Sequence, residues 1–272
     1  MIIIFSMVNF AFLDSGIGGL PYLKYLKEKN PSASCIYIGD TKNFPYGEKT
    51  KSCIIEESCA CVEKIIARWK PHTIVVACNT ISVTALEEMR RRFPETPFVG
   101  TVPAVKPAGL LSKKRCIGLL ATYATIHHPY TKDLCSRFAP DCRIVPRADS
   151  ELISFIEHRF FSAPEEERAL AVRPAVDFFK ENGCDVIVLA CTHFLNMADY
   201  IRACAGKEIT VVDSREGVAK HALAVEYMET TGFEKTAEDS ALYVTGFTVS
   251  NDSRTYETFC RQNKIRFGGI LE

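Results

Sequence analysis

The feature that most constrains this chain is an alternation of short, nearly continuous apolar runs with longer helical patterns. The apolar runs predict strands at 9–14, 34–40, 73–78, 97–102, 116–122, 142–146, 185–191 and 208–213. Helical periodicity lies between several of them, as at 20–29, 52–69 and 82–93. Strands that are apolar throughout are typical of parallel sheets covered by helices on both faces. The sequence therefore predicts an α/β fold.

One apolar motif occurs twice. "VVACNT" at 75–80 and "VLACTH" at 188–193 each end in Ala-Cys followed by small polar residues. Each copy follows a helical pattern, and a further helical pattern resumes after it. The repeat predicts two similar α/β halves, each contributing one cysteine. The proline-containing stretch 95–108 is the best candidate for the crossover between them.

Composition argues against several functional classes. The chain has 272 residues with 33 basic and 33 acidic side chains, so its charge gives no reason to expect nucleic acid or an anionic membrane. The apolar N-terminus lacks the pattern of a signal peptide and is too short to span a bilayer. The cysteines fit a reducing cytoplasm better than a disulfide scaffold. Zinc is not expected, because Cys59 and Cys61 have no second ligand pair at a suitable spacing.

Ligands of open parallel sheets bind outside the carboxyl ends of the strands. The residues expected there are rich in hydroxyl, amide and backbone donors and poor in cations, which suits a carboxylate ligand. They are Asp14, Ser15, Asp40, Pro45, Tyr46, Gly47, Cys78, Asn79, Thr80, Thr122, Thr125, Cys191, Thr192, His193, Asp213 and Ser214. The "DSGIGG" run at 14–19 lacks the G-x-G-x-x-G spacing of a dinucleotide site.

Cys78 and Cys191 stand out because they are matched and each lies between a predicted strand and a helix. The start of a helix lowers a thiol pKa from about 8.5 toward neutrality. His193 could orient or deprotonate Cys191, and Asp14 could do the same for Cys78 if their strands are neighbours. The alternatives are ordinary core packing for the cysteines and a helix cap for Asp14.

Two activated thiols indicate different chemistry from one. A single activated cysteine indicates a nucleophile. Two on opposite walls of a site indicate proton removal from one face of a carbon and proton delivery to the other. That reaction inverts the stereocentre, and fixed hydrogen bonds would have to stabilise the developing carbanion.

Five motifs in order and spacing resemble those of the glutamate racemases, in the cofactor-independent aspartate/glutamate racemase group. They are "FLDSGIGGL", "DTKNFPYGEK", "VACNT", "ATYAT" and "LACTH". The resemblance implies two pseudo-symmetric, doubly wound α/β domains with the active site between them. It implies a first domain of residues 1–100 plus 214–272, a second of 101–213, and a homodimer in the cytoplasm without metal or cofactor.

The resemblance also assigns roles. It implies that Cys78 and Cys191 exchange protons with the substrate, assisted by Asp14 and His193. Substrate-binding residues would be Asp14, Ser15, Pro45, Tyr46, Gly47, Asn79, Thr80, Thr122, Thr125, Thr192 and His193. Glu157 is similar to a family glutamate near the second cysteine. The family's Tyr-Pro after the histidine is replaced here by "FLN", and 103–109 reads "PAVKPAG".

The resemblance implies interconversion of L- and D-glutamate, with D-glutamate supplied to peptidoglycan. The alternatives are an aspartate racemase, a one-cysteine decarboxylase or hydrolase on the same scaffold, and a non-catalytic amino-acid-binding protein. The glycine-rich "DSGIGG" and the "PYG" motif favour glutamate over aspartate.

Overall fold

The computed structural model describes residues 8–229, 240–247 and 251–272. The chain divides into two compact units. The first joins the segment up to Thr101 with the segment from Arg215 onward, and the second spans Val102–Ser214. Each unit has its own sheet, and every strand pairing in the described residues is parallel. The predicted α/β class is confirmed. The segment 1–6 lies outside the described residues.

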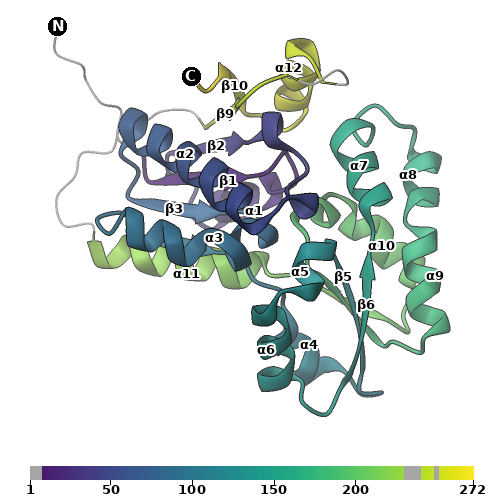
Figure 1. The fold of residues 1–272 in the computed structure, drawn as a ribbon. Helices are drawn as coiled ribbons and strands as arrows, with labels where there is room; N and C mark the ends of the chain where they lie inside the picture. The colour runs from purple at the N-terminus through teal and green to yellow at the C-terminus, as the bar shows by residue number, and fades with distance from the viewer. Residues whose placement is uncertain (1–7, 230–239, 248–250) are drawn as a thin grey trace, which may run out of the picture. The chain divides into compact units, whose positions relative to one another are not determined.

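The first unit is built on a sheet of order β10-β9-β2-β1-β3-β4. Its strands are β1 (Phe10–Asp14), β2 (Cys35–Gly39), β3 (Thr73–Val76), β4 (Phe98–Gly100), β9 (Ala241–Val244) and β10 (Arg266–Ile270). Its helices are α1 (Leu20–Lys29), α2 (Lys51–Trp69), α3 (Asn79–Arg92), α11 (Arg215–Glu229) and α12 (Ser253–Gln262), with short 3₁₀ helices η1 (Thr41–Asn43) and η2 (Tyr46–Glu48) (Figure 1).

Helices cover both faces of this sheet because both faces are apolar. Successive strand side chains point to opposite faces. Ala11 and Leu13 of β1 belong to one core with residues of α2 and α3. Phe10 and Phe12 point the other way and are fully buried as well. Helices α1 and α11 pack together, α1 against β2 and α11 against β3.

The second unit has a sheet of order β6-β5-β7-β8. Its strands are β5 (Cys116–Ala121), β6 (Arg143–Ala148), β7 (Val186–Leu189) and β8 (Thr210–Val212). Its helices are α4 (Val105–Leu111), α5 (Tyr123–His127), α6 (Pro129–Phe138), α7 (Ser150–His158), α8 (Glu165–Ala171), α9 (Arg173–Glu181) and α10 (Ala198–Ala205), with the 3₁₀ helix η3 (Thr192–Met197). Helices α4 and α6 pack together, as do α8, α9 and α10 (Figure 1).

The two units repeat the same strand order. In the first unit the order β2-β1-β3-β4 places the second strand on one side of the first and the third strand on the other. The order β6-β5-β7-β8 does the same in the second unit. Each unit therefore reverses its winding direction between its first and third strands, the place where open α/β sheets bind ligands. The duplicated cysteine motif follows the third strand in both.

All eight predicted strands are present, and two were missed. Strands β9 and β10 extend the first sheet beyond β2. The predicted helices at 20–29 and 52–69 match α1 and α2, whereas α3 begins at Asn79, three residues earlier than predicted. Within the described part of the chain, no helix combines the length and apolar character needed to cross a membrane.

Candidate active site

The two cysteines of the repeated motif occupy equivalent positions in their units. Cys78 lies two residues after β3 and is the N-cap residue of α3. Cys191 lies two residues after β7 and is the N-cap residue of η3. Both have extended backbone conformations, and both side chains are buried. The helical pattern expected after Cys191 begins as a 3₁₀ helix and becomes α-helical at Ala198.

In the first unit, β1 and β3 are neighbours, which brings the residues after each strand together. Leu13 pairs with Val76, and the Ala77 N–H donates to the Leu13 carbonyl at 2.7 Å. Ser15 and Cys78 therefore meet, with 3.8 Å between Sγ and Oγ. The proposed proximity of the Asp14 and Cys78 strands is correct.

Asp14 is held by its own unit and has no solvent exposure. Its Oδ2 accepts hydrogen bonds from the Gly19 N–H at 2.8 Å and from the Tyr37 hydroxyl at 3.0 Å. Gly19 is the N-cap residue of α1, so the carboxylate binds the N–H of the cap residue instead of capping the helix itself. These bonds fix the carboxylate at the end of β1.

Asn79 and Thr80 form the first turn of α3 and are buried. Neither the amide nitrogen nor the amide oxygen of Asn79 has a hydrogen-bond partner among the described residues. A buried polar group left unpaired costs about 1–3 kcal/mol. The Asn79 amide is therefore a group that a polar ligand would stabilise.

The loop after β2 is anchored by Asp40, which has no solvent exposure. Its carboxylate accepts from the Tyr46 hydroxyl, from the Asn43 amide at 3.1 Å and from the Thr245 hydroxyl at 2.6 Å. Burial and then the Asp40 charge raise the pKa of Tyr46 far above its ordinary value, so the hydroxyl stays protonated. These bonds fix Tyr46 between the half-buried Pro45 and Gly47.

In the second unit, Cys191 belongs to a chain of three side chains. Its Sγ lies 3.8 Å from Nδ1 of His193, and Nε2 of His193 lies 2.8 Å from Oε2 of Glu157 on α7. The histidine and glutamate side chains are almost completely buried. Burial lowers the pKa of His193, but hydrogen bonds to Cys191 and Glu157 and their charges outweigh burial and hold that pKa well above its ordinary value.

Thr122, Thr125 and Thr192 follow the carboxyl ends of β5 and β7 in the second sheet. Thr122 follows β5 as the N-cap residue of α5, and its Oγ1 accepts from the Thr125 N–H at 3.1 Å. Strand β5 pairs with β7, so this cap lies beside the end of the strand that precedes Cys191. Thr192 is buried in the first turn of η3.

Of two residues that support the site, Tyr37 was missed from the sequence and Glu157 was identified. Tyr37 was missed, although a tyrosine within the apolar run "CIYIG" is the signal of a buried hydroxyl that needs a partner. Glu157 was identified by its similarity to a family glutamate, and in the structure its partner is His193.

Among the described residues, no group of three or more His, Cys, Asp or Glu side chains is arranged to hold a metal ion.

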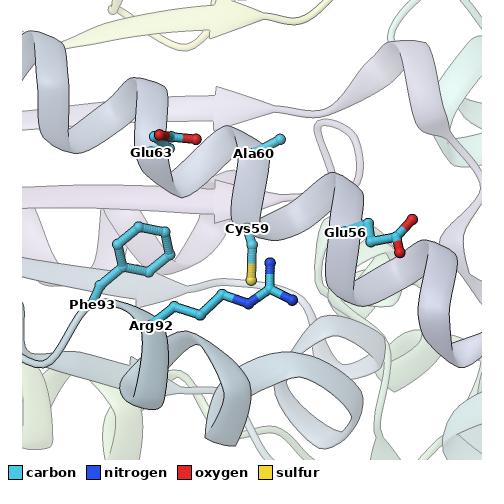
Figure 2. Close-up of a pocket in the computed structure, with 6 residues that line it drawn as sticks. All are labelled: Glu56, Cys59, Ala60, Glu63, Arg92 and Phe93. Atoms are coloured by element: carbon cyan, nitrogen blue, oxygen red, sulfur yellow. The ribbon is translucent and has the colours of Figure 1, made fainter.

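A hollow in the helical layer of the first unit contains none of the predicted site residues. It has a volume of about 370 Å³ and is lined by Glu56, Cys59, Ala60 and Glu63 of α2 with Arg92 and Phe93 at the end of α3 (Figure 2). Because it lies away from the carboxyl ends of the strands, we assign it no role in the site.

Comparison with known proteins defines the class. A family model described as Asp/Glu/Hydantoin racemase matches residues 23–222, most of the chain. The chain belongs to this family, and its named relatives are amino-acid racemases, a class of isomerase.

Within this family, the named relatives with similar sequences or structures are glutamate racemases. The glutamate racemase of Treponema pallidum (strain Nichols) is 40% identical over 264 residues, covering 97% of both chains. That of Shewanella loihica is 34% identical over 237 residues, covering 87% of both. The crystal structure of Escherichia coli glutamate racemase, in complex with L-glutamate and the activator UDP-MurNAc-ala, matches with a TM-score of 0.82 and 27% identity, covering 97% of both chains.

Proposed function

We propose that this protein is a cofactor-independent glutamate racemase in which Cys78 and Cys191 exchange protons with the substrate. The observation that carries the proposal is the equivalence of the two cysteines. Each follows the third strand of a repeated four-strand order and begins a helical segment. A fold that duplicates one thiol position suits a reaction with two mirror-related proton transfers.

The proposed reaction divides the work between the two thiols. One thiolate removes the proton from the α-carbon of glutamate, and the other thiol delivers a proton to the opposite face. The roles exchange when the reaction runs in the other direction. General acid–base groups of this kind contribute about 10²–10⁴-fold to a rate. Both proposed proton transfers use side chains of this chain.

The groups beside each thiol give the two halves different proton chemistry. His193 lies between Cys191 and Glu157, and its contacts with them raise its pKa, which favours the protonated imidazole. A protonated imidazole stabilises the Cys191 thiolate and returns a proton when that sulfur acts as acid. We assign Asp14 the role of accepting a proton from Cys78 and returning it, because it ends the strand beside β3.

We assign substrate binding to the neutral donors at the strand ends. Asn79, Thr80 and Thr192 offer hydroxyl, amide and backbone N–H groups at the starts of helical segments, where a carboxylate is stabilised, and Ser15 offers a hydroxyl directly after β1. The unpaired amide of buried Asn79 supports this assignment most directly. Pro45, Tyr46, Gly47, Thr122 and Thr125 would complete the binding surface.

Circular dichroism of amino acids incubated with the purified protein tests the activity. We expect the signal of L-glutamate to decay to zero as D-glutamate forms, with a much slower change for L-aspartate. Faster loss of the L-aspartate signal would make it an aspartate racemase. Unchanged signals, with saturable glutamate binding measured by calorimetry, would make it a binding protein. Carbon dioxide release with an achiral amino acid as product would indicate a decarboxylase.

We further propose that the D-glutamate serves peptidoglycan synthesis in the cytoplasm and that the protein acts as a homodimer. The support is the resemblance to glutamate racemases. Depletion of the protein in its own cells should produce a requirement for external D-glutamate. Sedimentation of the purified chain would measure its oligomeric state.

A further inference from the structure

A second pair of cysteines lies at the amino ends of the strands in the second unit. Cys191 follows the carboxyl end of β7, at the opposite end of the same strands. Cys116 begins β5, and Cys184 lies in the turn between α9 and β7. Their Sγ atoms are 3.5 Å apart although the residues are 68 positions apart in sequence. Both side chains are buried, with 5% exposure for Cys116 and 2% for Cys184.

The backbone around the pair is fixed by Asp185. Its carboxylate accepts from the Ser112 hydroxyl at 2.6 Å and from the N–H groups of Lys113 and Lys114 at 2.7 Å. Its own N–H donates to the Cys116 carbonyl at 3.1 Å. The segment that leads into Cys116 is therefore tied to the residue that follows Cys184. The two sulfur atoms meet because hydrogen bonds hold the two main-chain segments side by side.

Of the two sulfur atoms, that of Cys116 contacts the side chain of an exposed residue. The guanidinium of Arg143 on β6 donates to Cys116 Sγ at 3.2 Å and to the carbonyl of Asn182. Arg143 itself is exposed. A small oxidant that reaches this guanidinium thus lies beside Cys116 before it meets the more deeply buried Cys184. Neither thiol has a part in the proposed racemisation.

We propose that Cys116 and Cys184 are a modification site, a dithiol that hydrogen peroxide closes reversibly to a disulfide linking β5 to the start of β7. Closure needs the sulfur atoms to approach from 3.5 Å to about 2.05 Å, a movement of the side chains. Because Ile117 pairs with Val186, Cys184 precedes the residue opposite Cys116 by one position. Strands about 4.8 Å apart with a rise of about 3.3 Å per residue then place the two Cα atoms within the separations that disulfides bridge.

The chemistry balances with one peroxide. The Cys116 sulfur attacks a peroxide oxygen while the O–O bond breaks, giving a sulfenic acid and one water. The Cys184 sulfur then attacks the sulfenic sulfur, the S–O bond breaks, and a second water leaves with the Cys184 proton. Two thiols and one hydrogen peroxide give one disulfide and two waters. The sulfurs lose two electrons and the peroxide gains two.

Peptide mapping of the full chain after mild peroxide treatment and alkylation tests the proposal. Trypsin cuts after Arg115, Lys132 and Lys180, and cleavage before Asp185 separates Cys184 from Cys191. We expect peptide 116–132 linked to peptide 181–184, with the link lost on reduction. Recovery of the two peptides unlinked, or of Cys116 as sulfinic acid, would overturn the proposal.

Variants and melting temperature supply an independent readout. Cys184→Ser should abolish the linked peptide, whereas Cys135→Ser, a change of a half-buried cysteine on α6, should leave its yield unchanged. Oxidation should raise the melting temperature of the wild type by several degrees, because the bond closes a long loop in the unfolded chain, and reduction should reverse it. An equal rise in Cys184→Ser would contradict the proposed link.

Discussion

At the scale of single residues, the two halves differ most in what surrounds each thiol. Cys191 is connected through His193 to a buried carboxylate, whereas the Cys78 sulfur lies beside the Ser15 hydroxyl. The two cysteines of the duplicated motif therefore occupy equivalent positions in their units but have different neighbouring side chains. The unequal partners lead us to expect that the two cysteines differ in basicity.

Replacement of either proposed proton-transfer cysteine tests its role. We expect Cys78→Ala and Cys191→Ala to reduce racemisation by about 10²–10⁴-fold or more, since each removes an acid–base group that the reaction requires. Circular dichroism in the far ultraviolet should show folded protein in both. Cys204→Ala on α10 is the control and should keep wild-type activity. Full activity in either test variant would refute the assignment.

The pairing of Glu157 with His193 predicts a pH-dependent contribution to stability. Because the folded pKa of His193 is raised, its contribution is fully present below the unfolded value of about 6.5 and is lost as pH rises through the folded pKa. Glu157→Gln should therefore cost most in mildly acidic solution, below about pH 6.5, and less as the pH rises into the alkaline range.

Denaturant unfolding across this pH range measures the effect. Glu151→Gln, an exposed change on the same helix, is the control and should cost little at any pH. A stability difference between Glu157→Gln and wild type that grew toward alkaline pH would contradict the raised pKa of His193.

At the scale of elements, apolar runs predicted β1–β5 and β7 because these strands are mostly buried, and predicted the more exposed β6 and β8 because their sequences still contain apolar β-branched residues. Strand β9 (Ala241–Val244) was missed although it is a buried apolar run like β3 and β7, and β10 was missed because it is an edge strand with two glycines and exposed side chains. The strand-end residues of the site could be predicted as well, because they directly follow the apolar runs that predicted the strands. Their partners could not, because Asp40 meets Thr245 across 205 sequence positions.

The loop that ends β2 gives a prediction about substrate affinity. Tyr46→Phe removes the hydroxyl that Asp40 accepts from, leaving a buried carboxylate with one bond fewer. We expect a loss of about 1–3 kcal/mol of folding free energy. We also expect KM for glutamate to increase more than kcat falls, because the loop carries proposed binding residues. Tyr130→Phe, at an exposed position, should change neither value.

The start of α1 gives a second prediction at this scale. A Cβ added at Gly19 would lie 2.5 Å from the Ala77 carbonyl oxygen and 2.9 Å from the Ala77 Cβ. Gly19→Ala should therefore destabilise the protein and displace the segment before Cys78. Gly217→Ala on α11 meets no atom within 4 Å and should stabilise the helix by about 1 kcal/mol. Thermal unfolding of both variants measures the contrast, and equal melting temperatures would contradict the close approach.

At the scale of the whole molecule, the repeated motif predicted two similar α/β halves, and the structure shows that the two units share a strand order. Both units place a cysteine beyond their third strand, where the winding direction reverses. The different lengths of the units were not evident from that motif, because the added strands β9 and β10 come from the far end of the chain. The duplication is the basis for proposing one reaction with two thiols.

The most direct test of the two-thiol account is racemisation of L-glutamate in D₂O, stopped early and analysed by mass spectrometry after chiral separation. The account predicts D-glutamate carrying deuterium at the α-carbon, while recovered L-glutamate stays protiated, because the thiol that removes the proton is not the one that delivers deuterium. Deuterium appearing in recovered L-glutamate as fast as in the product would indicate a single base and contradict the account.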